Sequence, residues 1–194
     1  MFRETLIKSK AKRLSELGID ALRMNHPALK GMDIVCINIS GQSINDERFL
    51  EYIVDLLEDD LEKSRICFDI SETSLISSVE QAQFFIATLK AMGCRIALDD
   101  FGFGVSSFGL LKRLQVDYLK INRDIVRNMA SSSVDYEIVL ALSRIAKTLR
   151  IETIAQGVST LATKDSLLGM GVDYVQGVLI EQPQPILFAA QSTH

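Results

Sequence analysis

The chain has 194 residues, of which 47% are hydrophobic and 24% are charged. This composition is typical of one globular domain and excludes a disordered or fibrous protein. The formal net charge of −4 provides no basic surface for a nucleic-acid backbone, and no apolar stretch approaches the roughly 20 residues that span a bilayer. We therefore expect neither nucleic acid nor a membrane among its partners.

The first 33 residues precede the regular part of the pattern. Residues 1–17 have the periodicity of one amphipathic helix that ends at Gly18, and a less regular connection with Pro27 and Gly31 follows. The sequence contains no linker, low-complexity tract or internal repeat. We therefore expect this N-terminal helix and connection (1–33) to belong to the same single domain as the core (34–190).

From residue 34 onward, short apolar runs alternate with longer segments of helical periodicity. The runs predict six strands, at Ile34–Ile39, Ile66–Ile70, Arg95–Leu98, Tyr118–Ile121, Thr153–Ala155 and Tyr174–Val178. The segments between them carry apolar residues at helical spacing, such as Phe49, Ile53 and Leu56. Six strand–helix units joined by short loops are typical of an α/β domain with a parallel sheet and right-handed crossovers.

A doubly wound sheet and a (βα)8-like barrel both have this order of elements. Ser40-Gly41-Gln42 lacks the glycine fingerprint of a doubly wound nucleotide-binding sheet. Nearly every strand instead ends in a polar residue, and the carboxyl ends of barrel strands converge on one face, where active sites form. These strand-end residues are Asn38, Asp69, Asp99, Asp100, Lys120, Gln156 and Gln176. The pattern therefore favours the barrel.

Asp99-Asp100-Phe101-Gly102 is the most informative segment. Adjacent carboxylates at the end of an apolar strand are costly unless a cation lies between them, and carboxylate oxygens suit Mg²⁺ or Mn²⁺. The alternative is an acidic turn that caps a helix beginning near Ser106. The Asp-Phe-Gly triplet also occurs in protein kinases, but the chain has neither their glycine-rich loop nor their His-Arg-Asp loop.

Lys120 closes an apolar strand, where a lysine is seldom buried without a partner. Beside an acidic site it would hold a water molecule or neutralise a phosphate, and otherwise it is an exposed lysine on a sheet edge. The shared position of Asn38, Gln156 and Gln176 at strand ends indicates a common site. The alternative for each of them is a hydrogen bond to the backbone of a neighbouring loop. Glu72 is either an acid in a first helical turn or a support for a neighbouring loop.

The three cysteines, Cys36, Cys67 and Cys94, lack the CxxC spacing of a metal site. Each lies in or beside an apolar run, which is typical of core thiols in a reducing cytoplasm. We therefore expect a cytoplasmic protein whose cysteines fill core space. Ligation of a metal by these cysteines is the alternative.

The order and content of these motifs resemble the EAL domain family. The central signature is matched by Asp99-Asp100-Phe101-Gly102, Leu111-Lys112-Arg113-Leu114 and Asp117-Tyr118-Leu119-Lys120-Ile121. The flanking motifs are matched in order by Asn38-Ile39-Ser40, Ala155-Gln156-Gly157-Val158 and Gln176-Gly177. The resemblance covers about residues 34–186.

This resemblance implies a modified TIM barrel that hydrolyses the bacterial second messenger cyclic di-GMP to linear pGpG, with two Mg²⁺ or Mn²⁺ ions activating water. Lys120 matches the lysine beside the attacking water, and Glu72 matches the glutamate that steadies the Asp-Asp loop. The implied metal ligands are Asn38, Asp69, Asp99 and Asp100. The implied contacts with the nucleotide are Asp100, Gln156 and Gln176.

Four positions depart from the family pattern. Asp69 stands where the family has Glu, so its carboxylate is one methylene shorter. Gln156 also stands where the family has Glu, which removes a negative charge from the metal site, and Asn122 stands where it has Asp. Phe103 stands where the family has a small residue in the Asp-Asp loop. We expect this bulky side chain to disturb the contact between that loop and Glu72.

The Glu-Ala-Leu strand that names the family is missing from this alignment. Asp20-Ala21-Leu22 has the wrong spacing to Arg23, and residues 26–29 fit the connection before the strand of Asn38. The resemblance then implies an incomplete barrel without its first strand and first helix. A metal-ligating glutamate and an arginine that grips the substrate phosphate are lost with them.

Two-metal hydrolysis needs enough anionic ligands to hold both ions in fixed geometry. The leading hypothesis is therefore a non-catalytic module, either a cyclic di-GMP receptor or an interaction element of that signalling system. One alternative is a weak phosphodiesterase whose missing glutamate comes from a partner chain or an upstream segment. Another is a barrel fragment that serves only as a dimerisation surface. The two exposed edges of an incomplete barrel favour a homodimer or association with other signalling domains.

Overall fold

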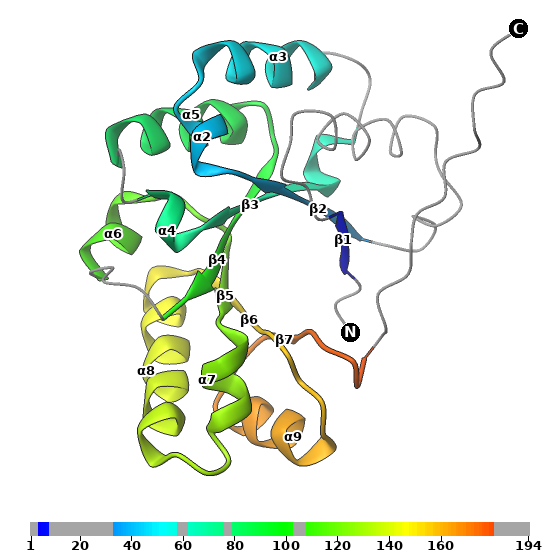
Figure 1. The fold of residues 1–194 in the computed structure, drawn as a ribbon, viewed down its shortest axis with the longest axis vertical. Coiled ribbons are helices and arrows are strands. Elements are labelled where there is room, and N and C mark those ends of the chain that lie inside the picture. Colours follow the sequence, from blue (N-terminus) through cyan, green and yellow to red (C-terminus); the bar gives the residue numbers. More distant parts are fainter. Residues whose placement is uncertain (1–3, 8–32, 58–61, 76–78, 103–107, 181–194) are drawn as a thin grey trace, which may run out of the picture.

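The computed structural model describes residues 4–7, 33–57, 62–75, 79–102 and 108–180. Their seven strands form one sheet in which spatial order follows chain order and every neighbouring pair is parallel (Figure 1). The strands are β1 (Glu4–Ile7), β2 (Ile34–Ile39), β3 (Ile66–Ser71), β4 (Arg95–Phe101), β5 (Tyr118–Ile121), β6 (Glu152–Ala155) and β7 (Tyr174–Val175). A doubly wound sheet reverses its strand order at a switch point, so this sequential order confirms the incomplete barrel-like fold.

Helices connect the strands and lie along the outer side of the curved sheet (Figure 1). They are α2 (Gly41–Ile44), α3 (Glu47–Leu57), the 3₁₀ helix η2 (Lys63–Arg65), α4 (Glu72–Leu75), α5 (Val79–Ala91), α6 (Phe108–Arg113), α7 (Arg123–Asn128), α8 (Ser133–Leu149) and α9 (Leu161–Gly169). Within the described ranges, no helix has both the length and the apolar character needed to span a membrane.

The N-terminal segment differs from the sequence-based prediction. A helix over residues 1–17 is wrong for Glu4–Ile7, which forms β1 and pairs with β2 from Glu4↔Ile34 to Ile7↔Ile37. The structure thus places a strand before β2, where the sequence predicted none. Threonine and isoleucine favour extended backbone, and the edge of β2 offers unpaired hydrogen-bonding groups to this segment. The remainder of the expected helix and the connection with Pro27 lie outside the described residues.

The six predicted strands are all present, and two of them differ from the prediction by more than one residue. β4 continues to Phe101, three residues beyond the prediction, because its register with β5 shifts between Leu98 and Phe101. β7 is limited to Tyr174–Val175. After it the backbone turns toward residue 158, whose amide donates to the Gln176 carbonyl at 3.0 Å.

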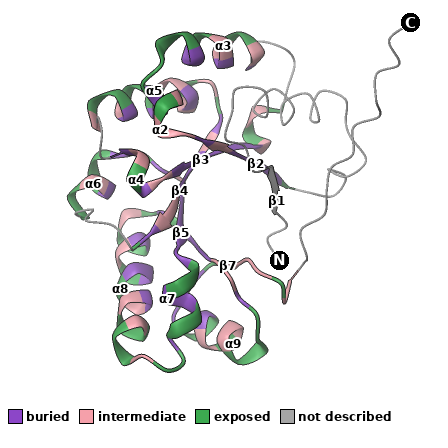
Figure 2. Ribbon diagram, viewed as in Figure 1, coloured by how far each residue is buried: buried purple, intermediate pink, exposed green. Residues whose placement is uncertain are grey.

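Strands β2 to β6 are buried on both faces over most of their length, as parallel strands are when helices cover one side and neighbouring strands curl over the other. Outward residues such as Ile37, Phe68 and Leu119 pack against the helices in the larger core cluster. Inward residues form a second, smaller cluster, comprising Ile34, Cys36, Cys67, Ala97, Tyr118 and Ile154. The buried colouring accordingly runs along the strands and only one stripe of each helix (Figure 2).

Glycines and side-chain caps mark several ends of the described helices. Gly93 and Gly171 follow α5 and α9 with φ of +92° and +81°, the left-handed conformation expected after a helix. Asp46 immediately precedes α3, and its Oδ1 accepts a hydrogen bond from the Arg48 amide at 3.0 Å.

Gly177 lies where the chain after β7 crosses the backbone of Val158. A Cβ at this position would lie 2.2 Å from the Val158 carbonyl oxygen and 2.4 Å from its nitrogen. We expect Gly177→Ala to lower the free energy of unfolding by at least about 2 kcal/mol, as measured by urea denaturation. Gly169→Ala is the matched control, because nothing lies within 4 Å of its Cβ in α9; it should be neutral or stabilise by up to about 1 kcal/mol. Equal changes in the free energy of unfolding for the two substitutions would contradict a close contact between residue 177 and the Val158 backbone.

Candidate functional site

The alternation of strand residues brings polar side chains to the inner side of the sheet at its carboxyl ends. In each strand the polar residue lies two positions after an inward core residue and so faces the same way. Asn38 follows Cys36, Asp69 follows Cys67, Asp99 follows Ala97, Lys120 follows Tyr118 and Gln156 follows Ile154. We call the side chains of Asn38, Asp69, Asp99, Asp100, Lys120, Gln156 and Gln176 the polar ring.

Lys120 and Asp69 form an ion pair inside the ring. Lys120 Nζ donates to Asp69 Oδ2 at 2.5 Å, and both side chains are 0% exposed. β4 lies between their strands, and its residue in register with Asp69 is Ala97, whose methyl side chain leaves room for the lysine to reach across. The alternative of an exposed edge lysine is therefore wrong.

Asp99 and Asp100 each accept a hydrogen bond from a side-chain amide. Gln156 Nε2 donates to Asp99 Oδ1 at 2.8 Å, and Asn122 Nδ2 donates to Asp100 Oδ1 at 3.3 Å. The register shift in β4 falls at these two aspartates, and Asp100 has a left-handed φ of 56°. Such irregularities re-aim side chains at functional sites, and here both carboxylates reach amide donors from the strands next in line.

Glu72 begins α4 and is 2% exposed. Its Oε2 accepts a hydrogen bond from the Gly102 amide at 3.1 Å, which ties α4 to the backbone just after the Asp-Asp pair. This contact lies at the position of the support that the family resemblance implies. Phe103, the departure expected to affect it, and Ser106 lie outside the described residues.

The amide oxygens of Gln156 and Gln176 are buried acceptors. Within the described residues, neither Oε1 has a hydrogen-bond partner. Main-chain bonds hold the two residues side by side, since the Gln176 amide donates to the Ala155 carbonyl at 2.8 Å. Buried polar atoms are normally satisfied, so two adjacent orphaned acceptors indicate a position where a donor from a ligand or from water belongs.

The three cysteines are free and buried, as predicted for core thiols. Cys36 and Cys67 are directly in register on β2 and β3 and belong to the inner cluster, next to Asp69. Burial raises the pKa of the Cys36 thiol well above its ordinary value, and Cys67 and Asp69 raise it further. Cys94 lies in the outer core, and burial raises the pKa of its thiol to about 12.

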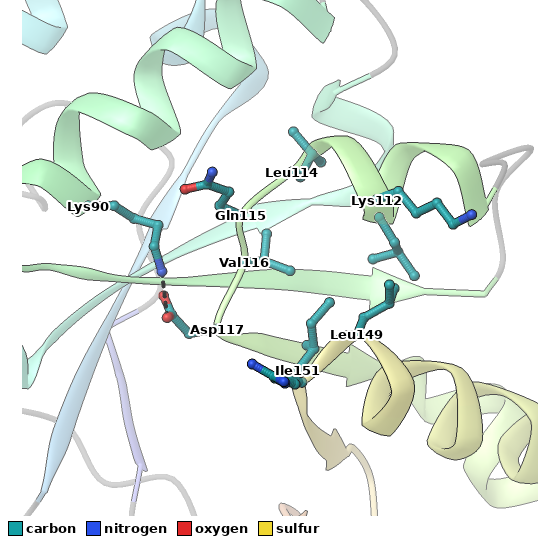
Figure 3. Close-up of a pocket in the computed structure, with 10 residues that line it drawn as sticks. Lys90, Lys112, Leu114, Gln115, Val116, Asp117, Leu149 and Ile151 are labelled. Atoms are coloured by element: carbon teal, nitrogen blue, oxygen red, sulfur yellow. Dashed lines mark hydrogen bonds and ion pairs between the residues drawn. The ribbon is translucent and has the colours of Figure 1, made fainter.

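A surface pocket of about 390 Å³ opens at the amino ends of β5 and β6, the opposite end of the sheet from the polar ring (Figure 3). Its cations are Lys90 and Lys112 in the last turns of α5 and α6, and Arg150, which caps α8. Cations at these positions offset the negative partial charge of helix carboxyl ends, and Lys90 also pairs with Asp117 at 2.5 Å. Helix electrostatics thus account for these cations, and no residue of the polar ring lines the pocket.

Comparison with known proteins identifies the family. The EAL domain profile matches residues 6–183, which is most of the chain. The chain belongs to the EAL domain family. Among curated proteins, the cyclic di-GMP phosphodiesterase PdeF of Escherichia coli K12 is 36% identical over 152 residues, covering 78% of this EAL domain and 20% of PdeF. The chain thus spans about a fifth of the length of this relative.

Solved EAL structures have the same fold. The PaMucR phosphodiesterase in complex with c-di-GMP superimposes with a TM-score of 0.82 at 27% identity, covering 90% of this EAL domain and 71% of that chain. Klebsiella pneumoniae BlrP1 with manganese and cyclic di-GMP superimposes with a TM-score of 0.74 at 26% identity, covering 88% and 45% of the two chains. Both relatives bind the nucleotide, and one of them binds it with a divalent ion.

The polar ring of this EAL domain does not fit a pair of divalent ions. Its three carboxylates are Asp69, Asp99 and Asp100, and each already accepts a hydrogen bond from a protein donor. Lys120 offsets one of the three negative charges. Two divalent ions would exceed the net charge of −2 on the ring by two positive charges, which no side chain of the ring balances.

The energetic effect of burying the Lys120–Asp69 ion pair can be tested against a more exposed ion pair with the same N–O distance. We expect Lys120→Met to cost about 3–5 kcal/mol, because it leaves a buried charge uncompensated. The double variant Asp69→Val/Lys120→Met should be more stable than the Lys120→Met variant. Lys90→Met is the control, because the Lys90–Asp117 pair has the same 2.5 Å separation but is about 30% exposed; it should cost no more than about 1 kcal/mol. Urea denaturation measures all three, and similar losses for the two lysines would contradict the burial argument.

The Gln156–Asp99 bond predicts a gain of metal binding on substitution. Gln156→Glu replaces an amide donor with a second carboxylate next to Asp99, which destabilises the metal-free protein by like-charge repulsion and creates a ligand for a hard cation. We expect saturating Mn²⁺ to raise the Tm of this variant by at least roughly 5 °C, with little change for the parent protein. Gln156→Ala, which loses the hydrogen bond without adding charge, should gain no response. A parent protein stabilised by Mn²⁺ as strongly as Gln156→Glu would refute the assignment.

Proposed function

We propose that this EAL domain is a non-catalytic receptor for cyclic di-GMP that binds the nucleotide without a divalent metal. The relatives with which it shares its fold include proteins solved with cyclic di-GMP bound, and the polar ring occupies the strand ends where barrel proteins build their sites. A receptor transmits the concentration of a ligand to a partner and needs no turnover of that ligand.

One observation carries the proposal. Gln156 donates its amide N–H to Asp99 at 2.8 Å, at the position where the family resemblance implies a carboxylate ligand. A donor at this place satisfies Asp99 directly, as a metal ion would otherwise do. Asn122 likewise donates a side-chain amide N–H to the carboxylate of Asp100. Each carboxylate of the ring is therefore held by a donor from the protein, and Lys120 neutralises one of the three charges.

The orphaned oxygens of Gln156 and Gln176 supply the recognition chemistry. They are uncharged acceptors held next to one another by the pairing of β6 and β7. Guanine amino groups and ribose hydroxyls are donors of the kind that would satisfy them. A ligand that meets these acceptors gains the full benefit of removing an unsatisfied buried group, which is about 1–3 kcal/mol.

A metal-dependent phosphodiesterase is the second candidate. Asp99, Asp100 and Lys120 remain in place, Glu72 holds the Gly102 amide, and PdeF carries the name of a cyclic di-GMP phosphodiesterase. Hydrolysis by two ions nevertheless requires ligands that hold both of them in fixed geometry. In this ring the candidate ligands bind protein donors, so the geometry favours the receptor.

Calorimetric titration with cyclic di-GMP in EDTA tests the proposal, alongside a chromatographic assay for linear pGpG in Mg²⁺ and in Mn²⁺. We expect saturable binding in EDTA and no linear product with either metal. Binding that requires metal, or sustained formation of pGpG, would establish the phosphodiesterase instead. Absence of binding under every condition would overturn both nucleotide functions and leave only an interaction role.

Two glutamine variants make the titration specific to the polar ring. Gln176→Ala removes one of the orphaned acceptors, so we expect affinity to fall by about fivefold, the equivalent of about 1 kcal/mol. Gln115→Ala removes an exposed glutamine at the opposite end of the sheet and should leave affinity unchanged. Equal effects of the two variants would place the nucleotide somewhere other than the polar ring.

A further inference from the structure

The inner cluster contains a second set of potential ligands beneath the polar ring. Cys36 and Cys67 each offer a sulfur and Asp69 offers a carboxylate oxygen, and these three atoms lie within 4.8 Å of one another. All three residues are buried, with exposed fractions of 0–1%. The function proposed above uses neither thiol.

We propose that Cys36, Cys67 and Asp69 bind one thiophilic divalent cation of the Zn²⁺ class. The spacing comes close to what such an ion requires, because ligand sulfurs around a tetrahedral zinc lie roughly 3.8 Å apart at Zn–S bonds of about 2.3 Å. Thiolates select zinc-like ions over Mg²⁺ and Mn²⁺. The site is thus chemically distinct from a hard-metal site at the strand ends.

The fold fixes all three ligands on rigid elements. Cys36 and Cys67 are register partners on adjacent strands, and Asp69 lies two residues after Cys67 on the same inward face of β3. Sites built on strands hold ligand geometry more tightly than sites on loops. The small side chain of Ala97 and the ring of Tyr118 complete the wall of the cluster.

Lys120 supplies both orientation and charge balance. It donates to Asp69 Oδ2 at 2.5 Å, as outer partners of metal ligands do when they orient a carboxylate. Binding displaces the protons of the two thiols, since the metal ligand is the thiolate. The two thiolates and the Asp69 carboxylate then carry three negative charges, which the divalent ion and the Lys120 ammonium together neutralise. A fully buried ion therefore leaves no net charge in the interior.

Anaerobic refolding with Co²⁺, in the presence of a non-thiol reductant and the absence of nucleotide, tests the site. We expect one equivalent of Co²⁺ to bind with a thiolate-to-cobalt charge-transfer band, and Zn²⁺ to displace it. Cys36→Ser and Cys67→Ser should each weaken binding by more than about 100-fold, because loss of an outer partner alone costs about 10- to 100-fold. Cys94→Ser is the matched control, since this buried cysteine is outside the cluster and its loss should leave the band intact.

Parent protein that refolds to its native circular dichroism spectrum and shows no charge-transfer band overturns the proposal. A band that survives Cys36→Ser and Cys67→Ser but disappears in Cys94→Ser overturns it as well. Because the measurement uses no cyclic di-GMP, either result leaves the proposed receptor function standing. Conversely, failure to bind the nucleotide in EDTA does not affect the cobalt result.

Discussion

The ammonium of Lys120 and the carboxylate of Asp69 lie 2.5 Å apart in the interior of the sheet, with neither side chain exposed. Charges removed from water must stay paired, so this contact fixes β3 relative to β5 across the intervening β4. It also separates two chemical environments. Toward the carboxyl ends of the strands lie amides and carboxylates, and toward the amino ends lie thiols and apolar side chains.

Three of the departures from the family pattern, at Asp69, Gln156 and Asn122, act together. The shorter Asp69 binds the lysine, and the amides at Gln156 and Asn122 donate to Asp99 and Asp100. Here every carboxylate of the ring has a donor within the protein. The ring retains its arrangement without an ion, as the proposed metal-free receptor requires.

Much of this architecture follows from local patterns in the sequence. Strands such as Ile34–Ile39 and Tyr118–Ile121 were predictable because apolar runs end abruptly at polar residues. β1 was not, because Glu4–Ile7 lies in a stretch whose apolar spacing is that of a helix, and its strand conformation depends on pairing with the edge of β2. The register shift at Asp99 and the left-handed Asp100 are also invisible in sequence.

The strand-end positions of the ring residues were likewise predictable, but their partners were not. Lys120 and Asp69 are 51 residues apart in sequence, and their contact depends on the curl of three strands and on the small Ala97. Asn122 stood out as a departure from the family, but only the conformation of Asp100 brings the two side chains together. The pairing of Cys36 with Cys67 requires the register of β2 and β3, which spacing alone does not specify.

A crystal structure grown with cyclic di-GMP and Mn²⁺, with anomalous scattering recorded at the manganese edge, tests the central claim most directly. The account predicts nucleotide density against Gln156 and Gln176, no anomalous peak between Asp99 and Asp100, and an intact bond from Gln156 to Asp99. Two manganese peaks bridging the ring and the phosphate, with Lys120 turned away from Asp69, would contradict it.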